Sequence, residues 1–221
     1  MSPVAAYDAY ADWYEHYIAD SAAYFSDRVN ASLRELLGPG RGVCLDMCCG
    51  TGARAWLLRA LGWTPVGVDI SRGQLGYATS RLPAVAGDAV ALPLASSSVS
   101  AVVCVLAHTD MPDYAAALRA AARVLRPGGR LVHVGVHPCF TGAFADRSDP
   151  ARIVIDERYA DRSRSFDAWS PHGVRARVGA WHVPLADLLN GILYAGLRLV
   201  RTAEGGPPGI PGLFGVLAVK A

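Results

Sequence analysis

The feature that most constrains this chain is an apolar run that ends in a glycine-rich turn, residues 43–53. The run is apolar apart from Asp46, and Cys48-Cys49-Gly50-Thr51-Gly52 follows it before a stretch of helical composition. Glycines in such a turn let a ligand approach the backbone closely, beside the free N–H groups of a helix N-terminus. The segment therefore predicts a strand, a ligand-binding turn and a helix in succession.

The same alternation of short apolar runs and helical stretches continues along the chain. The expected strands are 43–47, 66–70, a third before Gly87, 99–106, 131–136, 197–202 and 213–219. The expected helices are 5–17, 22–37, 53–61, 114–125 and 184–195. Strands joined by crossover helices predict a parallel sheet that helices cover on both faces.

Composition indicates a single domain, 1–221, that binds neither nucleic acid nor membrane. The chain of 221 residues is 52% hydrophobic and can bury one sizeable core. Its 21 basic and 19 acidic side chains are spread along the chain and give a net charge of +2, so no strong field favours phosphate backbones or anionic lipid. A signal-peptide pattern and a bilayer-length apolar stretch are both lacking, and the five cysteines include an adjacent pair unsuited to an ordinary disulfide. We expect a cytoplasmic monomer or homodimer with reduced cysteines.

Two segments flank the alternating core. Two helices are expected within residues 1–37, ahead of the core at 40–137. Residues 138–181 lose the alternation and are rich in Arg, Asp, Pro and aromatic side chains, which predicts a loop-rich cap. Residues 182–221 return to the pattern with a helix and the last two strands.

The acidic residues at the strand ends indicate the kind of ligand. A dinucleotide-binding turn would have glycines where this chain has Cys48 and Ala53, and Asp46 would repel a pyrophosphate. The same carboxylate suits an ammonium group without phosphates, such as the methionine end of S-adenosylmethionine. Asp69 ends the next strand at roughly the twenty-residue separation expected for an acid that binds ribose hydroxyls.

Together these residues resemble the class I S-adenosylmethionine-dependent methyltransferases, in particular the small-molecule, type 11-like branch. Asp46, Gly50 and Gly52 fit the first family motif, Cys48 departs from its first glycine, and residues 123–131 resemble the usual helix, turn and strand after the fourth strand. The resemblance implies a Rossmann-like, seven-stranded, mostly parallel sheet with helices on both faces. It also implies an N-terminal helical lid and a cap that borders the acceptor.

The resemblance further implies how the cofactor is held. Asp69 is expected to bind the ribose, Ile70 to flank the adenine, Asp88 to accept from its amino group, and Tyr14 to reach the cofactor from the lid. The full expected set is Tyr14, Asp46, Cys48, Gly50, Gly52, Asp69, Ile70, Asp88, Ala89 and Leu106. S-adenosylhomocysteine would be the product. We expect no metal, since Asp110 and Asp113 lack a clear third ligand.

Methyl transfer needs a positioned acceptor and, for a hydroxyl, acid or amine, a base. His108 stands at the carboxyl end of the fourth strand and His182 precedes the late helix, so both are candidate catalytic residues. The alternative for each is a structural histidine that bonds or packs locally. His16, His133 and His172 are expected to be structural or solvent-facing.

The leading function is methyl transfer to an oxygen or nitrogen atom of a small metabolite with an apolar or aromatic part, since residues 138–181 supply aromatic surface. One alternative keeps the cofactor but catalyses a rearrangement or cyclisation, because fold and cofactor do not fix the reaction. Another is a non-catalytic module that only binds the cofactor. Methylation of RNA or protein is disfavoured because the chain lacks a basic tract and the acceptor motif of those enzymes.

Overall fold

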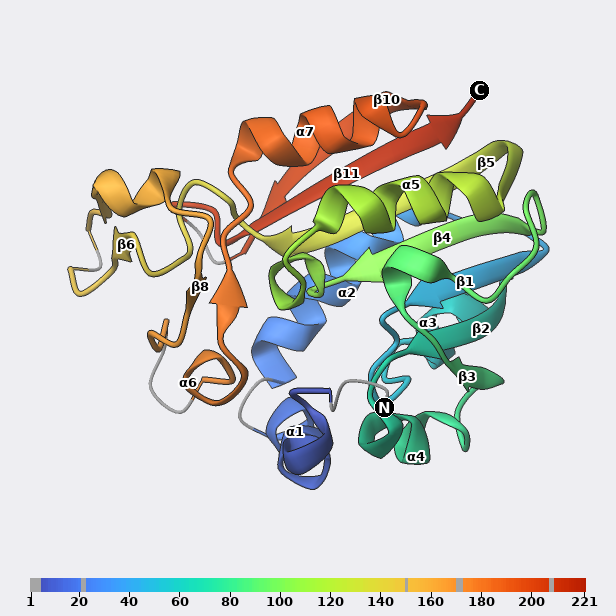
Figure 1. Ribbon diagram of the computed structural model, residues 1–221, viewed down its shortest axis with the longest axis horizontal. Helices are drawn as coiled ribbons and strands as arrows, with labels where there is room; N and C mark the ends of the chain where they lie inside the picture. Colours follow the sequence, from blue (N-terminus) through green and yellow to red (C-terminus); the bar gives the residue numbers. More distant parts are fainter. Residues whose placement is uncertain (1–4, 21–22, 150, 170–172, 207–208) are drawn as a thin grey trace.

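The computed structural model describes residues 5–20, 23–149, 151–169, 173–206 and 209–221, and its centre is a seven-stranded sheet (Figure 1). The strand order is β10-β11-β5-β4-β1-β2-β3. The strands are β1 Val43–Met47, β2 Thr64–Asp69, β3 Ala84–Ala86, β4 Val99–Val105, β5 Leu125–Val136, β10 Leu197–Gly205 and β11 Leu213–Lys220. All neighbouring pairs are parallel except those that β11 makes with β5 and β10. The predicted mostly parallel α/β sheet is confirmed.

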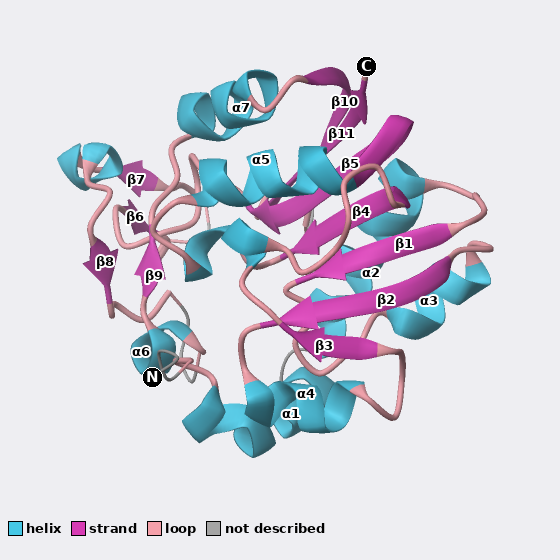
Figure 2. Cartoon of the chain, turned by 45° about the vertical axis from the view of Figure 1, so that its right-hand side comes forward, coloured by secondary structure: helices cyan, strands magenta, loops and turns pink. Residues whose placement is uncertain are grey.

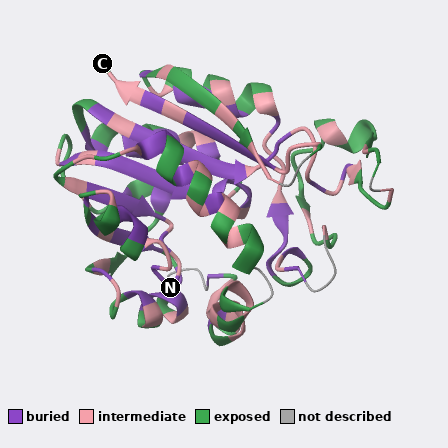
Figure 3. Cartoon of the chain, turned by 180° about the vertical axis from the view of Figure 1, so that it is seen from behind, coloured by how far each residue is buried: buried purple, intermediate pink, exposed green. Residues whose placement is uncertain are grey.

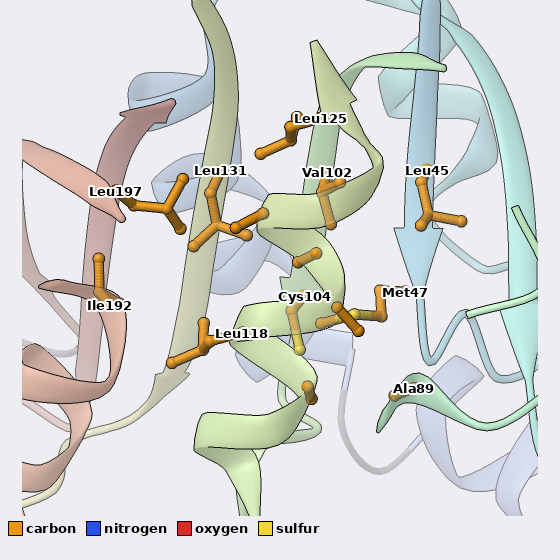
Figure 4. Close-up of a cluster of buried hydrophobic side chains, with 14 of the residues drawn as sticks. Leu45, Met47, Ala89, Val102, Cys104, Leu118, Leu125, Leu131, Ile192 and Leu197 are labelled. Carbon is orange, nitrogen blue, oxygen red and sulfur yellow. The ribbon is translucent and has the colours of Figure 1, made fainter. Parts of the chain in front are cut away.

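Helices cover both faces of this sheet. On one face α5 (Tyr114–Val124) and α7 (Leu185–Tyr194) bury their apolar sides against alternate residues of the strands, among them Leu45, Val102 and Leu131 (Figure 4). On the other face α2 (Ala23–Leu37) and α3 (Ala55–Ala60) cover the intervening residues, which include Cys44, Val103 and Val132. Successive strand residues belong to different cores because side chains alternate across a strand. This explains why the central strands β1 and β4 are largely apolar and could be located from sequence.

Most boundaries differ from the sequence-based expectation by a few residues, and two differ by more. β5 begins at Leu125 instead of 131, and the expected turn at 126–129 is a register shift inside it, where Leu125 pairs with Val99 and Arg130 with Ala101. The first helix, α1, spans Ala11–Ala19 and follows a 3₁₀ turn at Asp8–Tyr10, so the expected start near residue 5 is wrong. The Asp8 carboxylate bonds to the N-terminus of another helix, α4 (Arg72–Ala78). It accepts hydrogen bonds from Ser71 Oγ at 2.7 Å and from Gly73 N at 3.0 Å.

The N-terminal segment is tied to the core through α4 and the residues after it. Asp12 accepts a hydrogen bond of 2.7 Å from the Tyr77 hydroxyl, and Glu15 forms an ion pair with Arg81. These contacts hold α1 beside α4, as Figure 2 shows. The segment is therefore placed to cover the cofactor turn, although its role as a lid stays a prediction.

Residues 138–181 add small elements beside the carboxyl ends of the central strands (Figure 2). These elements are β6 Ala145–Asp146, β7 Val154–Ile155, η4 Glu157–Ala160, β8 Arg164–Ser165, α6 Arg175–Val178 and β9 Ala180–Trp181. Much of this region is exposed, whereas the central sheet is largely buried (Figure 3). The Arg177 guanidinium lies 4.3 Å from the centre of the Trp13 ring, so α6 contacts the N-terminal segment. Within the described ranges, no helix is long and apolar enough to cross a membrane.

Candidate active site

A cavity of about 1070 Å³ opens where the turns after β1, β2, β3 and β4 meet the N-terminal segment and residues 141–178. In open parallel sheets, ligands bind beyond the carboxyl ends of the strands, which is where this cavity lies. Eight of the ten expected cofactor residues line it: Tyr14, Cys48, Gly50, Asp69, Ile70, Asp88, Ala89 and Leu106. Asp46 and Gly52 are not among its lining residues.

The turn after β1 is held in a conformation that favours glycine. Cys48, Gly50 and Gly52 have φ angles of +61°, +55° and +72°. Left-handed backbone costs a residue with a side chain roughly 1–2 kcal/mol, which explains why the family motif has glycine at the position of Cys48. A Cβ atom on Gly52 would lie 2.6 Å from Leu82 Cδ2 and 3.2 Å from the Cα of Ala78 in α4. Gly52 therefore permits close packing behind the turn and does not face the cavity.

Asp69 connects the turns after β1 and β2. Its Oδ2 accepts a hydrogen bond of 2.8 Å from Gly50 N, and its Oδ1 accepts one of 2.8 Å from Ser71 N. Burial raises the pKa of this carboxyl above its usual range, and these backbone donors oppose that change. Each carboxylate oxygen can accept more than one hydrogen bond, so Asp69 can also receive hydroxyl groups from the cavity.

Asp46 is fully enclosed beneath the turn. Burial raises the pKa of Asp46 to about 7, and the nearby charge of Arg54 opposes that rise. Arg54 lines the cavity, and its Nε is buried with no hydrogen-bond partner among the described residues. Since a buried guanidinium atom without a partner is costly, the site offers Arg54 to an anionic group. Arg54 was not among the residues expected from the sequence, although its position directly after the glycine turn was a signal.

The remaining expected residues lie on two sides of the cavity. Ile70 is 45% exposed although apolar, and Asp88 accepts a hydrogen bond of 3.0 Å from Val90 N through only one of its carboxylate oxygens. Leu106 adopts a φ angle of +61° directly after β4, a strained conformation that such sites often contain. Tyr14 lines the cavity from α1, where burial raises the pKa of its hydroxyl and keeps it neutral.

The two candidate catalytic histidines do not line the cavity. His108 is 1% exposed, and its ring lies 4.9 Å from that of His133, behind the end of β4. The His182 ring packs against those of Phe144 and Tyr159 at 4.4 and 5.0 Å. Burial lowers the pKa of His108 well below its usual value and that of His182 to about 4. Their catalytic roles therefore stay predictions that the geometry does not favour.

The other histidines lie away from the cavity or outside the described ranges. His133 is completely buried and shares a hydrogen bond of 2.8 Å with the Tyr114 hydroxyl, while burial lowers its pKa to about 3. His16 bonds to the backbone oxygen of Asp12 at 2.7 Å. His172 lies outside the described residues.

Another part of the cavity wall brings together three polar side chains from separate segments. Asp110, which follows β4, accepts a hydrogen bond of 3.2 Å from the Tyr7 hydroxyl and forms an ion pair with Arg175 of α6. All three line the cavity, and Trp169 lines it beside them, with Arg175 5.2 Å from the centre of its ring. We refer to Tyr7, Asp110, Trp169 and Arg175 as the distal group. Sequence analysis considered Asp110 only as a metal ligand.

The fold and the site define a class of protein. A seven-stranded sheet with an antiparallel strand near one edge, a glycine turn after its first strand and an acid after its second are the features of Rossmann-like methyltransferases. Residues 45–133 match a family model described as a methyltransferase domain. A demethylmenaquinone methyltransferase from Mycolicibacterium paratuberculosis is 44% identical over 182 residues, which cover 77% of this chain and 74% of that protein. The chain belongs to the S-adenosylmethionine-dependent methyltransferases, which confirms the family expected from its motifs.

Solved structures share the fold at lower identity. An S-adenosylmethionine-dependent methyltransferase from Mesorhizobium loti gives a TM-score of 0.70 at 22% identity, covering 87% of this chain and 95% of that one. The [4+2]-cyclase SpnF gives a TM-score of 0.62 at 18% identity, covering 87% and 80%. Proteins named for different activities thus share one architecture, so the reaction must be argued from the site.

The residues present fit S-adenosylmethionine, the cofactor of this family. The buried Nε of Arg54 has no hydrogen-bond partner in the part of the chain that the structure describes, and it lies at the turn, as a binding group for a carboxylate would. Asp69 presents a carboxylate and Ile70 an exposed apolar surface at the next strand end. These side chains therefore fit the amino-acid part of the cofactor at the turn after β1 and its nucleoside part at the turn after β2.

Proposed function

We propose that this chain transfers the methyl group of S-adenosylmethionine to an oxygen or nitrogen atom of a small molecule with an apolar or aromatic part. The observation that carries the proposal is the continuity of the cavity from the glycine turn and Asp69 to the distal group. A cofactor held at the glycine turn and Asp69 leaves the space beside the distal group for an acceptor in this proposal. Residues on both sides of that space belong to this chain, as a small-molecule site requires.

The protein's own contribution is to bind, orient and exclude water. Bound S-adenosylmethionine supplies a methyl group on a positively charged sulfur, whose charge disperses during transfer. Asp69 and Asp88 hold the nucleoside, Arg54 holds the carboxylate, and Tyr14 covers them from α1 in this proposal. Aromatic and apolar side chains enclose the transfer, which keeps the acceptor at attack distance and water out.

The proposed class of acceptor is inferred from the residues that line the cavity and from the name of the 44% identical relative. The described lining residues with apolar or aromatic character include Met111, Trp169, Val174 and Val178. The similar protein from Mycolicibacterium paratuberculosis is named as a demethylmenaquinone methyltransferase. An acceptor with a hydroxylated ring is therefore the first class to assay.

The function is tested by mass spectrometry with purified protein, S-adenosylmethionine carrying a trideuterated methyl group and a panel of hydroxylated aromatic compounds, among them naphthols and 1,4-naphthohydroquinone. We expect one or more compounds to gain a trideuterated methyl group, with stoichiometric S-adenosylhomocysteine. A product of changed structure without added methyl mass would indicate the rearrangement or cyclisation alternative. Cofactor binding without any product across the panel would favour the non-catalytic module.

Replacing Arg54 by methionine is expected to weaken S-adenosylhomocysteine binding by about 10- to 100-fold, the scale of a hydrogen bond to a charged group. The control ligand is 5′-methylthioadenosine, which has the nucleoside but no carboxylate. Its affinity should change little, because Arg54 would then have no anion to bind. An equal loss for both ligands, measured by calorimetry, contradicts the assignment of Arg54 to the carboxylate.

A further inference from the structure

The carboxylates that line the cavity differ in the hydrogen-bond and ion-pair partners that they already have within the chain. Asp69 accepts from Gly50 N and Ser71 N, and Asp88 accepts from Val90 N in the short helix after β3. Asp113 caps α5 by accepting from Ala116 N at 2.8 Å, and it is also 3.7 Å from Arg119. Asp110 is the remaining carboxylate among the described lining residues, and it belongs to the distal group.

Asp110 is held firmly at one oxygen. Its Oδ1 receives the Tyr7 hydroxyl from the N-terminal segment and Arg175 Nη1 from α6. Among the described residues, the hydrogen bonds to the Asp110 side chain all go to Oδ1. The side chain is 22% exposed, and Asp110 lines the cavity. A carboxylate fixed in this way can present its second oxygen, Oδ2, to a bound molecule.

The ion pair with Arg175 favours the ionised form of Asp110, whereas burial strengthens that carboxylate as a base. Burial raises the pKa of the Asp110 carboxyl, and the positive charge of Arg175 opposes that rise. The neighbouring Tyr7 and Tyr14 hydroxyls have raised pKa values because they are buried, and the pKa of the Cys48 thiol is raised by Cys104 and by burial. These neighbours are therefore neutral donors at ordinary pH, and Asp110 is the group beside them that can take a proton.

We propose that Asp110 binds the O–H or N–H group of the methyl acceptor and takes its proton during transfer. The acceptor's O–H bond breaks and the proton passes to Asp110 Oδ2, from which solvent later removes it. The electron pair of that bond forms the new bond to the methyl carbon, while the methyl–sulfur bond breaks and leaves its pair on an uncharged sulfur. Tyr7 and Arg175 act as positioning residues for the carboxylate. This inference rests on the proposed function.

The test measures how much more tightly the protein binds a ligand with an O–H group than a ligand in which a methoxy group replaces it. The probes are 1-naphthol and 1-methoxynaphthalene, which share a ring system but differ in the donor, and they are titrated into protein saturated with S-adenosylhomocysteine. Wild-type protein is expected to bind 1-naphthol about 10- to 100-fold more tightly, since the hydrogen bond is to a charged group. Asp110→Asn should reduce that ratio to about threefold or less, and should lower methyl transfer to any acceptor found by mass at least about 100-fold.

Two further variants keep the result interpretable. Asp149→Asn changes an acid that is ion-paired with Arg152 away from the cavity, and it should leave the ratio and the affinity for S-adenosylhomocysteine unchanged. Removing Asp110 leaves Arg175 buried and unpaired, so the double variant Asp110→Asn/Arg175→Gln is read in the same way if the single variant does not fold.

The outcomes separate this inference from the proposed function. Equal affinity of the two probes for wild-type protein, or no affinity for either, overturns the role of Asp110. A ratio that persists in Asp110→Asn overturns it too. Loss of S-adenosylhomocysteine binding by wild-type protein would instead contradict the cofactor site itself.

Discussion

Replacing Asp69 by alanine is expected to weaken the binding of S-adenosylmethionine and S-adenosylhomocysteine by at least about 1.5–3 kcal/mol, or roughly 10- to 100-fold. The carboxylate is the proposed partner of the ribose hydroxyls, and it also fixes the turn after β1 through Gly50 N. Its loss therefore removes ligand contacts and loosens the turn that the ligand meets. Isothermal titration calorimetry measures the change directly.

The matched control for this variant is Asp149→Ala, which removes an acid outside the cavity. That variant should bind both ligands as the wild type does. Asp69→Asn is an intermediate case, because the amide retains one acceptor oxygen but lacks the charge. Unchanged affinity in Asp69→Ala, with the protein still folded, would contradict the assignment of the ribose to the end of β2.

Replacing Gly52 by alanine is expected to destabilise the fold by about 2–5 kcal/mol. The φ angle of +72° costs an alanine roughly 1–2 kcal/mol. The new Cβ would lie 2.6 Å from Leu82 Cδ2 and 3.2 Å from the backbone of Ala78, and such overpacking costs typically about 1–3 kcal/mol. Urea unfolding followed by circular dichroism gives the difference in the free energy of unfolding.

Gly76→Ala supplies the comparison, because Gly76 lies in α4 and a Cβ atom there meets nothing within 4 Å. Alanine is favoured over glycine in a helix, so this variant should be more stable by about 0.5–1 kcal/mol. The two substitutions add the same atom and should change stability in opposite directions. If Gly52→Ala proves neutral, the close packing of the cofactor turn on α4 is wrong.

The strand ends of the cofactor side could be predicted because their information is local. The apolar run at 43–47 became β1 with the same bounds, and Asp69 ends β2 as expected. The direction of a strand and the turn that follows it bring such residues to one edge of a parallel sheet without further knowledge. Cys48 fits the turn despite its side chain, since the backbone takes the left-handed conformation that the motif requires.

The part of the cavity proposed for the acceptor could not be predicted because it depends on distant contacts. Tyr7 and Asp110 are 103 residues apart, and Arg175 is a further 65 residues along the chain. Their meeting at one carboxylate oxygen depends on how the N-terminal segment and α6 fold over the sheet. His108 shows the same limit, because sequence placed it at the correct strand end but could not tell that its ring lies behind β4 against His133.

Calorimetric titration of the purified wild-type protein with S-adenosylmethionine and S-adenosylhomocysteine tests the central claim most directly. The account predicts saturable binding of both at one site per chain, in the micromolar range or tighter, with 5′-methylthioadenosine competing more weakly because it cannot engage Arg54. The absence of binding by either ligand to folded protein would contradict the assignment of the cavity between Asp69, Arg54 and the distal group.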